Sequence, residues 1–377
     1  MKFKSFFWIG LSVLFLLSGC SLSEKNPTEE TKPIQTEYPS SETVSSEPEE
    51  SVQLPGDTPP EDGMMRSRLT NEWVRADVAK TRPIAVIIPN EAHAVPHYNL
   101  SQASILYEAK VEGSMSRLMG IFEDWAKLQK IGNVRSLRSY FAYWALEWDA
   151  IIVHHGGPYF IYDLLSQDDI ENIDGMNEND SSAFYRTADR DAPHNLYTSG
   201  PKLLYSINQE QYSLTYRDLT EENHFQFAPS DEPNLLIQYS SAEDAAYIDM
   251  TASFPLTRCY FKYNEADGNY YRYQYLSGGV DGPHMDEATG EQLKFSNVLV
   301  QRIKQEDIGK GYLAMQCHDT TKDGWFFTKG KGIHVTWEKV GDYGATKFYD
   351  GSGKEILLNT GKTMILVIRD TDNFTYR

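Results

Sequence analysis

The chain has 377 residues and a formal net charge of −19, with 54 acidic and 35 basic side chains. A charge this negative argues against a general nucleic-acid binder, which needs a basic surface to displace counterions from phosphates, so no nucleic-acid partner is expected. The 40% hydrophobic content supports a folded core. Three cysteines exclude a disulfide-stapled scaffold and a multi-cysteine zinc framework.

The N-terminus has the pattern of an export signal. Lys2 and Lys4 precede an apolar run over residues 6–17, which is short for a membrane-spanning helix. The run ends in Leu-Ser-Gly followed by Cys20, which is the lipobox pattern of bacterial lipoproteins. We therefore predict a signal peptide over 1–19 and lipidation of Cys20, the alternative being an ordinary secretory signal with an incidental cysteine. Acyl chains on Cys20 would anchor the protein on the outer face of the bacterial cytoplasmic membrane.

A polar tether is expected to follow, over residues 20–70. Between Ser21 and Pro60 there are seven prolines and nine acidic residues, but only two lysines and one aromatic residue. Such a stretch buries too little apolar surface to offset the entropy lost on ordering. Proline and charge repulsion favour an extended chain that reaches on the order of 100 Å, at about 3.1 Å per residue.

The first part of the folded region mixes strands and helices. Apolar runs predict buried strands, and Ser139 is a plausible N-cap for a helix that continues to Trp148. The expected strands cover residues 84–88, 104–111, 117–122 and 149–154. Further helices are expected over 159–165 and 199–207.

Beyond about residue 225 the pattern favours strands, with turns at Asp267-Gly268, Asp323-Gly324 and Asp350-Gly351. The expected strands cover residues 234–239, 258–263, 270–276, 298–303, 312–317, 325–328, 333–338 and 364–368. We predict an α+β protein, with a mixed α/β domain over 71–228 and a mostly antiparallel β-rich domain over 229–377. One mixed sheet shared by both halves is the alternative.

Two carboxylates and an arginine-rich loop are the first candidates for chemistry. Glu108 and Glu112 have the same parity, so an undistorted strand would point both to one side, as an acid–base pair or as solvated charges. Arg135, Ser136 and Arg138 precede the expected helix. Two guanidiniums and the free amides of a helix start are typical of an anion site. The alternative is that these arginines pair with nearby glutamates and fix the fold.

Arg117 lies at the start of a neighbouring expected strand and is predicted to approach the same site. His155 ends another expected strand, and a second polar cluster contains Asp191, His194 and Asn195. His155, His194 and Asp191 are weak candidates for a divalent metal site, because they lack the local spacing of known motifs. Histidines hydrogen-bonded to backbone in a polar core are the favoured alternative.

The same segments resemble the YerB-like lipoprotein family of Gram-positive bacteria. Residues 131–141 read Ile-Gly-Asn-Val-Arg-Ser-Leu-Arg-Ser-Tyr-Phe, which is similar to the family pattern G-P-V-R-S-x-R-x-Y-F, with Asn133 where proline is usual. Further similar blocks lie at 82–86, 100–108, 112–119, 153–156, 193–199, 332–337 and 359–363. The resemblance covers roughly residues 80–370 and implies a lipoprotein with a two-part body. It implies no activity, because none is established for the family.

The leading hypothesis is a surface-tethered envelope lipoprotein that binds an anionic or glycan ligand, or a protein partner. Its ligand-binding candidates are Arg117, Arg135, Arg138, Ser136, Glu108 and Asn195. The alternative is an envelope hydrolase acting on a phosphodiester or glycan, with or without a metal, in which the arginines stabilise developing negative charge. Its candidate catalytic residues are Glu112, His155 and His194. The sequence identifies no cofactor and leaves enzymatic activity open.

Overall fold

The computed structural model describes residues 58–217, 219–220, 224–276 and 278–377. The predicted signal peptide, Cys20 and most of the predicted tether lie outside these residues. Within the described part of the chain the fold is α+β, as predicted. Strands of the N-terminal half belong to a mixed sheet, and strands of the C-terminal half pair mostly in antiparallel fashion.

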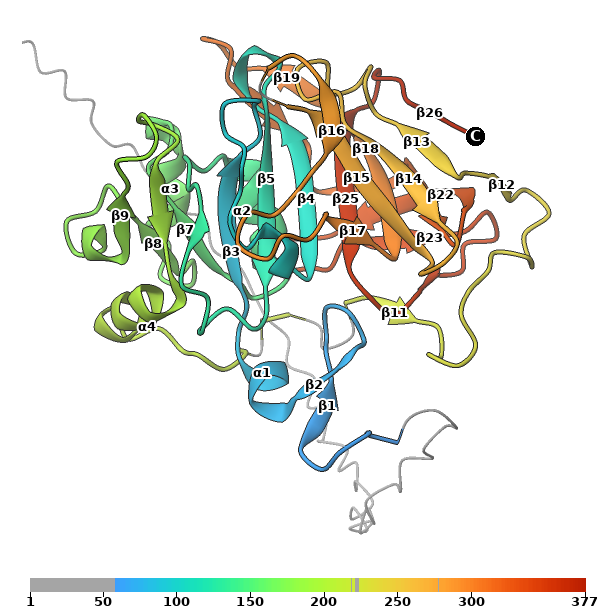
Figure 1. Ribbon diagram of the computed structural model, residues 1–377, viewed down its shortest axis with the longest axis horizontal. Helices are drawn as coiled ribbons and strands as arrows, with labels where there is room; N and C mark the ends of the chain where they lie inside the picture. Colours follow the sequence, from blue (N-terminus) through green and yellow to red (C-terminus); the bar gives the residue numbers. More distant parts are fainter. Residues whose placement is uncertain (1–57, 218, 221–223, 277) are drawn as a thin grey trace, which may run out of the picture. The chain divides into compact units, whose positions relative to one another are not determined.

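One large sheet of eleven strands runs through the described residues and includes strands from both halves of the chain (Figure 1). In spatial order its main path is β12 (Glu243–Asp244), β22 (Lys331–Lys339), β21 (Asp319–Thr328), β18 (Asn297–Ile303), β25 (Thr363–Arg369), β4 (Ile105–Lys110), β5 (Ser116–Phe122), β3 (Ile84–Pro89), β7 (Ile151–His154) and β8 (Asn172–Asp174). Strand β23 (Lys347–Tyr349) pairs with β22 outside this path.

A second sheet has six strands among the described residues. These are β16 (Asp281–Pro283), β15 (Asn269–Tyr275), β14 (Tyr260–Asn264), β13 (Tyr247–Asp249) and β26 (Thr375–Tyr376), with β17 (Lys294–Phe295) paired to β15. Smaller sheets join β1 (Met64–Arg66) to β2 (Trp73–Arg75), β6 (Ile131–Gly132) to β10 (Leu196–Thr198) and β9 (Phe184–Arg186), β11 (Gln226–Phe227) to β24 (Leu357–Leu358), and β19 (Gln305–Asp307) to β20 (Leu313–Met315).

Helices are short in the described part of the chain. The α-helices are α1 (Ala76–Lys80), α2 (Ser139–Leu146), α3 (Tyr162–Leu165) and α4 (Gly200–Gln209). The 3-10 helices are η1 (Leu100–Gln102), η2 (Glu112–Ser114), η3 (Tyr159–Ile161) and η4 (Ser181–Ala183). None of these helices combines the length and apolar composition needed to cross a bilayer.

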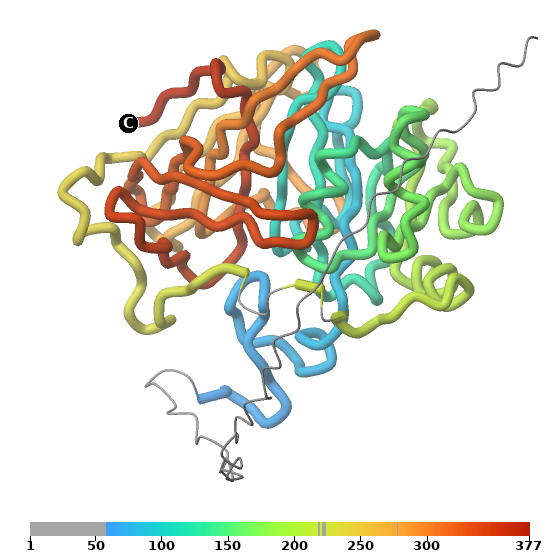
Figure 2. The backbone as a smooth tube through the Cα atoms, turned by 180° about the vertical axis from the view of Figure 1, so that it is seen from behind, coloured from blue at the N-terminus to red at the C-terminus, as the bar shows by residue number. Residues whose placement is uncertain are grey.

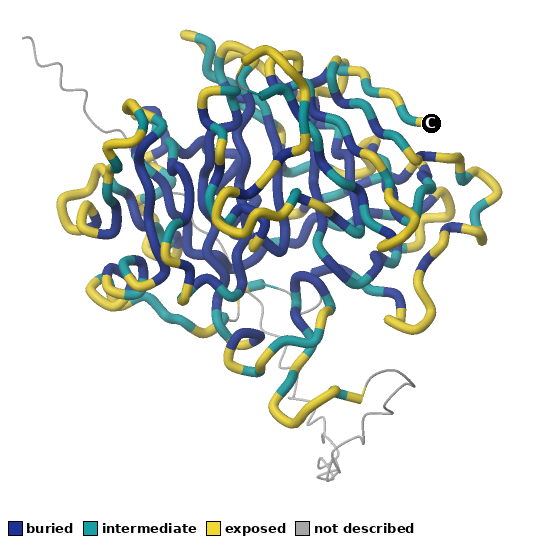
Figure 3. Tube along the Cα trace, viewed as in Figure 1, coloured by how far each residue is buried: buried dark blue, intermediate teal, exposed yellow. Residues whose placement is uncertain are grey.

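The central strands of the large sheet are buried on both faces, and alternate residues of these strands enter different hydrophobic clusters (Figure 3). In β4, Ile105 and Tyr107 face a cluster that contains the apolar residues of α2, whereas Leu106 faces a cluster that contains the six-stranded sheet and α4. Because alternate side chains point to opposite faces and both faces contact a hydrophobic cluster, these strands appear in the sequence as nearly continuous apolar runs.

The two halves of the chain meet where β25 lies between β18 and β4. Strand β25 is parallel to both neighbours, with Met364 opposite Val298 on one side and opposite Leu106 on the other. The N-terminal half, through β4, and the C-terminal half, through β25, are therefore adjacent at the centre of one sheet (Figure 2). This arrangement matches the shared-sheet alternative.

Three local expectations were wrong. Ser139 is not the N-cap of α2 but its first residue, because Arg138 occupies the N-cap position and no side chain caps the helix. No strand forms over residues 234–239, because the side-chain oxygen of Asn234 accepts the Leu236 N–H at 3.1 Å and Leu236 adopts a left-handed φ of 58°. Asp323-Gly324 is not a turn but part of β21. A Cβ on Gly324 would lie 2.8 Å from the Val300 carbonyl oxygen, so this glycine permits close approach of adjacent strands.

Candidate functional site

The carboxyl ends of β3, β7 and β8 lie along one edge of the large sheet. These strands are mutually parallel, and β5 begins at the same edge because Arg117 is opposite Pro89 in an antiparallel register. The loop before α2 crosses this edge: the Arg135 amide donates to the Ile87 carbonyl at 2.8 Å, and the Arg135 carbonyl accepts the His155 amide at 3.1 Å. Ligands of α/β sheets often bind at this edge.

Arg138 and Glu112 form a bidentate ion pair at this edge. The guanidinium Nε and Nη2 each donate to one carboxylate oxygen of Glu112 at 2.6 Å, and Nη1 donates to the Leu137 carbonyl at 2.7 Å. Burial raises the pKa of Glu112, but the hydrogen bond and charge of Arg138 outweigh it, so the net pKa is lowered. Arg138 therefore has its charge neutralised inside the protein.

Arg117 is a buried cation with no carboxylate bonded to it among the described residues. Its residue surface is 6% exposed, and its guanidinium donates only to the Ser136 carbonyl. Burial, followed by the positive charges of Arg138 and Arg135, lowers the pKa of Arg117 to about 9. A cation kept in such surroundings favours the approach of an anion.

Arg135 is half-buried, and its side chain forms no hydrogen bond or ion pair with any described residue. Its Nε is fully buried without an acceptor. Burial lowers its pKa; Glu91 opposes this effect, and Arg138 and Arg186 add to it. Arg135 thus has free donors at the same sheet edge at which Arg117 forms no ion pair with a described residue.

The other predicted site residues surround Arg135 in part. His194 lies 3.7 Å from a carboxylate oxygen of Glu91, and Asn195 accepts a 2.8 Å hydrogen bond from Arg186. Burial lowers the pKa of His155, and the positive charge of Arg186 lowers it further. Burial also lowers the pKa of His194, against the opposing charge of Glu91.

Sequence reasoning missed Glu91 and Arg186. Glu91 is the second residue after the end of β3, a position at which side chains are expected at the sheet edge. Arg186 is the last residue of the short strand β9, and nothing in the local sequence indicates its proximity to Arg135.

Glu108 does not lie at the arginine-rich edge. It is fully buried between the two sheets, where Arg272 of β15 donates to it at 2.7 Å. Asn90 and Ser116 donate to its other oxygen at 2.7 and 2.6 Å. The strand ends at Lys110, and Glu112 lies in η2, so the two carboxylates share no hydrogen-bond partner. The Glu108–Arg272 pair links the two halves of the chain.

A line of buried hydrogen bonds extends from that ion pair. Arg272 donates to Nδ1 of His284, His284 and His97 share a 2.8 Å bond, and His97 bonds the Pro89 carbonyl at 2.8 Å. Since the carbonyl can only accept, His97 carries its proton on Nε2 and His284 donates from Nε2. Burial lowers the pKa of His97 to about 3, which keeps this ring neutral.

The weak metal candidates are not gathered into one ligand set. Asp191 is exposed and uses its backbone carbonyl to accept the His194 amide at 3.0 Å. Among the described residues there is no group of three or more His, Cys, Asp or Glu side chains placed to hold a metal ion. Cys259 and Cys317 are both buried free thiols.

The fold and this edge define an α+β protein with one mixed sheet and an arginine-rich cluster at the carboxyl ends of its parallel strands. The family comparison agrees with the blocks seen in the sequence. Residues 69–213 match the family model described as protein of unknown function (DUF3048) N-terminal domain, and residues 248–365 match the corresponding C-terminal domain. The chain belongs to this YerB-like family.

Two comparisons with individual proteins support the assignment. The chain is 27% identical over 311 residues to the protein named "Putative lipoprotein YerB" of Bacillus subtilis (strain 168), which covers 82% of this chain and 87% of that protein. The crystal structure of YerB from Bacillus subtilis superposes with a TM-score of 0.69 at 24% identity, covering 82% of this chain and 99% of the other. The second likeness concerns the fold alone.

The Asn133 side chain holds the loop that presents Arg135. It donates to the carbonyls of Ala94 and His194 at 3.1 and 2.9 Å. The loop is therefore attached to two separate segments of the chain.

Proposed function

We propose that this protein is an envelope lipoprotein, anchored by acyl chains on Cys20 at the outer face of the cytoplasmic membrane, that binds an anionic ligand through Arg117 and Arg135. The lipobox around Cys20 and the name of the Bacillus subtilis relative support the anchor. The observation that carries the ligand site is a pair of guanidiniums at one sheet edge, neither of which forms an ion pair with a described carboxylate.

The arrangement suits binding of a phosphate, sulfate or carboxylate group. Arg117 and Arg135 supply fixed donors, while Arg138 is engaged by Glu112 and orients the loop. The first turn of α2 has no side-chain cap, so its free amides add partial positive charge near Arg138. Glu112 is held by Arg138 with a lowered pKa, which does not favour its service as a general base.

The binding test uses the full-length chain in detergent and thermal melts with phosphate, sulfate or chloride at equal ionic strength. We expect phosphate or sulfate to raise the melting temperature of the wild type and of Lys304→Met, a control at an exposed lysine paired with Glu306. Arg135→Met should lose this response while melting normally without anions. A response that persists in Arg135→Met would contradict the proposed site.

The anchor and the hydrolase alternative have separate tests. Metabolic labelling with a radioactive fatty acid should mark the wild type and not Cys20→Ala, and an unlabelled wild type would contradict the anchor. Incubation with a chromogenic phosphodiester, with and without added divalent metal, tests for turnover. Hydrolysis that is lost in His155→Ala would replace the binding proposal with the enzymatic one.

A further inference from the structure

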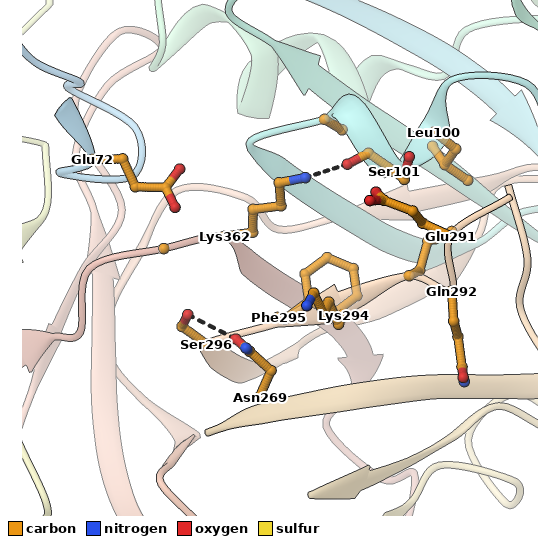
Figure 4. A pocket seen from close by; sticks show the side chains of 13 residues that line it. Glu72, Leu100, Ser101, Asn269, Glu291, Gln292, Lys294, Phe295, Ser296 and Lys362 are labelled. Atoms are coloured by element: carbon orange, nitrogen blue, oxygen red, sulfur yellow. Dashed lines mark hydrogen bonds between the residues drawn. The ribbon is translucent and has the colours of Figure 1, made fainter. Parts of the chain in front are cut away.

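A cavity lies away from the arginine-rich edge, between segments of both halves of the chain (Figure 4). Its volume is about 240 Å³. Its lining includes Ser101 from η1 and Glu72 from the N-terminal half, and Glu291, Ser296 and Lys362 from the C-terminal half. The family block at 359–363, which the anion site does not use, contributes Lys362.

The backbone around Lys362 is held from several directions. The Gly361 amide donates to the Thr70 carbonyl at 2.8 Å, and the Lys362 carbonyl accepts the Ser296 amide at 2.9 Å. Gly361 has φ of +124°, and a Cβ there would lie 2.1 Å from the Ser296 hydroxyl. Glycine is required at this position, and the result is a fixed backbone that directs one lysine into the cavity.

Asn359, the first residue of the 359–363 block, holds this block in place through buried hydrogen bonds. The Asn359 amide donates to the Asn297 side chain at 2.9 Å, and the Asn359 side chain donates to the Asn234 carbonyl at 2.8 Å. Asn297 returns a 2.7 Å bond to the Asn359 carbonyl. These buried amide pairs hold Asn359 in place, and Lys362 is the polar side chain of the block that lines the cavity.

The ammonium group of Lys362 has unused hydrogen-bonding capacity. Its only bond to a described residue is to the Ser101 carbonyl, so two of its three donors are free. Figure 4 shows the side chain between Glu72 and Glu291. Neither of these carboxylates forms a hydrogen bond or ion pair with a described residue, and neither approaches Lys362 closely enough for a salt bridge.

The charges of the cavity are therefore of both signs and unpaired. Burial lowers the pKa of Lys362, and the charges of Glu72 and Glu291 oppose that effect. The other lysine of the lining, Lys294, is engaged by Asp267 at 3.0 Å. Glu72 and Glu291 are exposed, and their negative charges act on Lys362. A compact ligand that offers an anionic acceptor to Lys362 and a cationic group to one of the glutamates therefore fits the charges of the cavity.

We propose that this cavity binds a small zwitterion, an α-amino acid, with its carboxylate on Lys362 and its ammonium group facing Glu291, which lies on the side of the cavity toward which the Lys362 ammonium group points (Figure 4). A simple anion leaves the glutamates unused and is repelled by them, and a simple cation is repelled by Lys362. A neutral sugar of similar size would leave Lys362 without a charged partner. The site is independent of Arg117 and Arg135.

Isothermal titration calorimetry and thermal melts of the full-length chain test the proposal with glycine and with the D- and L-forms of alanine and glutamate. Acetate, methylamine and N-acetylglucosamine serve as probes that lack one or both charged groups. At least one amino acid should bind, and it should raise the melting temperature more than a mixture of acetate and methylamine does. The Arg135→Met variant should respond like the wild type.

Lys362→Met should weaken the Kd for that amino acid at least about tenfold, because a charged hydrogen bond to the carboxylate is lost. Glu291→Gln, at an exposed position where folding is not at risk, should weaken it severalfold, and Lys304→Met should leave it unchanged. The proposal is overturned if no amino acid binds, if the affinity is unchanged in Lys362→Met and Glu291→Gln, or if acetate or N-acetylglucosamine alone gives the full effect.

Discussion

Arg135 and Arg138 are three positions apart in sequence, but the structure predicts different consequences of removing their charges. Arg138 is bonded to both oxygens of Glu112 and to the Leu137 carbonyl, with 9% of its side chain exposed. Arg135 has no side-chain partner among the described residues. Substitution by methionine keeps most of the aliphatic volume and removes the guanidinium in each case.

The magnitudes follow from these contacts. Breaking a buried ion pair costs about 3–5 kcal/mol, because the remaining charge stays buried and unpaired. The Glu112 side chain is 20% exposed, so water screens part of that cost, and we expect Arg138→Met to lower the free energy of unfolding by about 2–3 kcal/mol. Arg135→Met should change it by no more than ~0.5 kcal/mol, since no bond is broken.

Urea unfolding of the full-length chain in detergent at pH 7, followed by tryptophan fluorescence, measures both values under identical conditions. The double variant Arg138→Met/Glu112→Gln is the matched control, because it removes the stranded carboxylate and should recover part of the loss. A loss of stability in Arg135→Met as large as that in Arg138→Met would refute the reasoning and make the whole cluster structural.

Three further substitutions test the interior. Arg272→Met should destabilise by about 3–5 kcal/mol, because Glu108 is then buried without its cation, and adding Glu108→Leu should restore much of this in urea unfolding; an additive loss would contradict it. Burial raises the pKa of Glu123 to about 7 in the folded protein, above the value of about 4.5 in the unfolded chain. Ionisation of Glu123 therefore lowers the free energy of unfolding as the pH rises above about 4.5. Glu123→Gln should therefore gain roughly 3 kcal/mol over the wild type at pH 8 and nothing at pH 4, and an equal effect at both pH values would exclude this origin. Gly200→Ala places a Cβ 2.3 Å from the Trp125 and Ala126 carbonyl oxygens, so its melting temperature should fall by several degrees, whereas Gly351→Ala, in open space, should melt like the wild type.

Local signals in the sequence were sufficient for most strands and for the arginine-rich edge. The apolar run of β4 and the glycine that follows β7 are features of neighbouring residues in the chain, so a single sequence is enough to recognise them. Glu108 shows the limit of such reasoning. Its parity with Glu112 suggested a common face, but the strand ends at Lys110, and the side chain that binds Glu108 is 164 residues away.

The Lys362 cavity was not predicted for the same physical reason. Its lining comes from distant parts of the chain, and no short spacing joins Ser101, Glu291 and Lys362. The 359–363 block was recognised in the sequence, but its asparagine network depends on Asn234 and Asn297, which only the fold brings close to it. The sequence did not reveal this cavity because its residues are far apart in the chain, and weak secondary-structure propensity was not the reason.

The final prediction concerns the boundary near residue 228 between the two expected domains. Separate fragments covering 58–228 and 229–377 should each fail to fold, although the family is described by an N-terminal and a C-terminal model. Cutting there removes β25 from β4 along a register of five residue pairs and exposes the central edge of the sheet. It also leaves Glu108 in one fragment and Arg272 in the other.

Both hydrophobic clusters likewise draw on both fragments, so neither fragment retains a complete core. Each fragment alone should therefore show poorly dispersed NMR amide signals and no cooperative thermal transition. Co-expression should restore a single cooperative transition, because the missing strand and the missing charge are then supplied by the partner fragment. Restoration should fail when the C-terminal fragment carries Arg272→Glu, which places two acidic groups in one buried site, and should persist with the exposed Lys304→Met. A fragment that folds cooperatively on its own would show that the shared sheet is not the unit of stability.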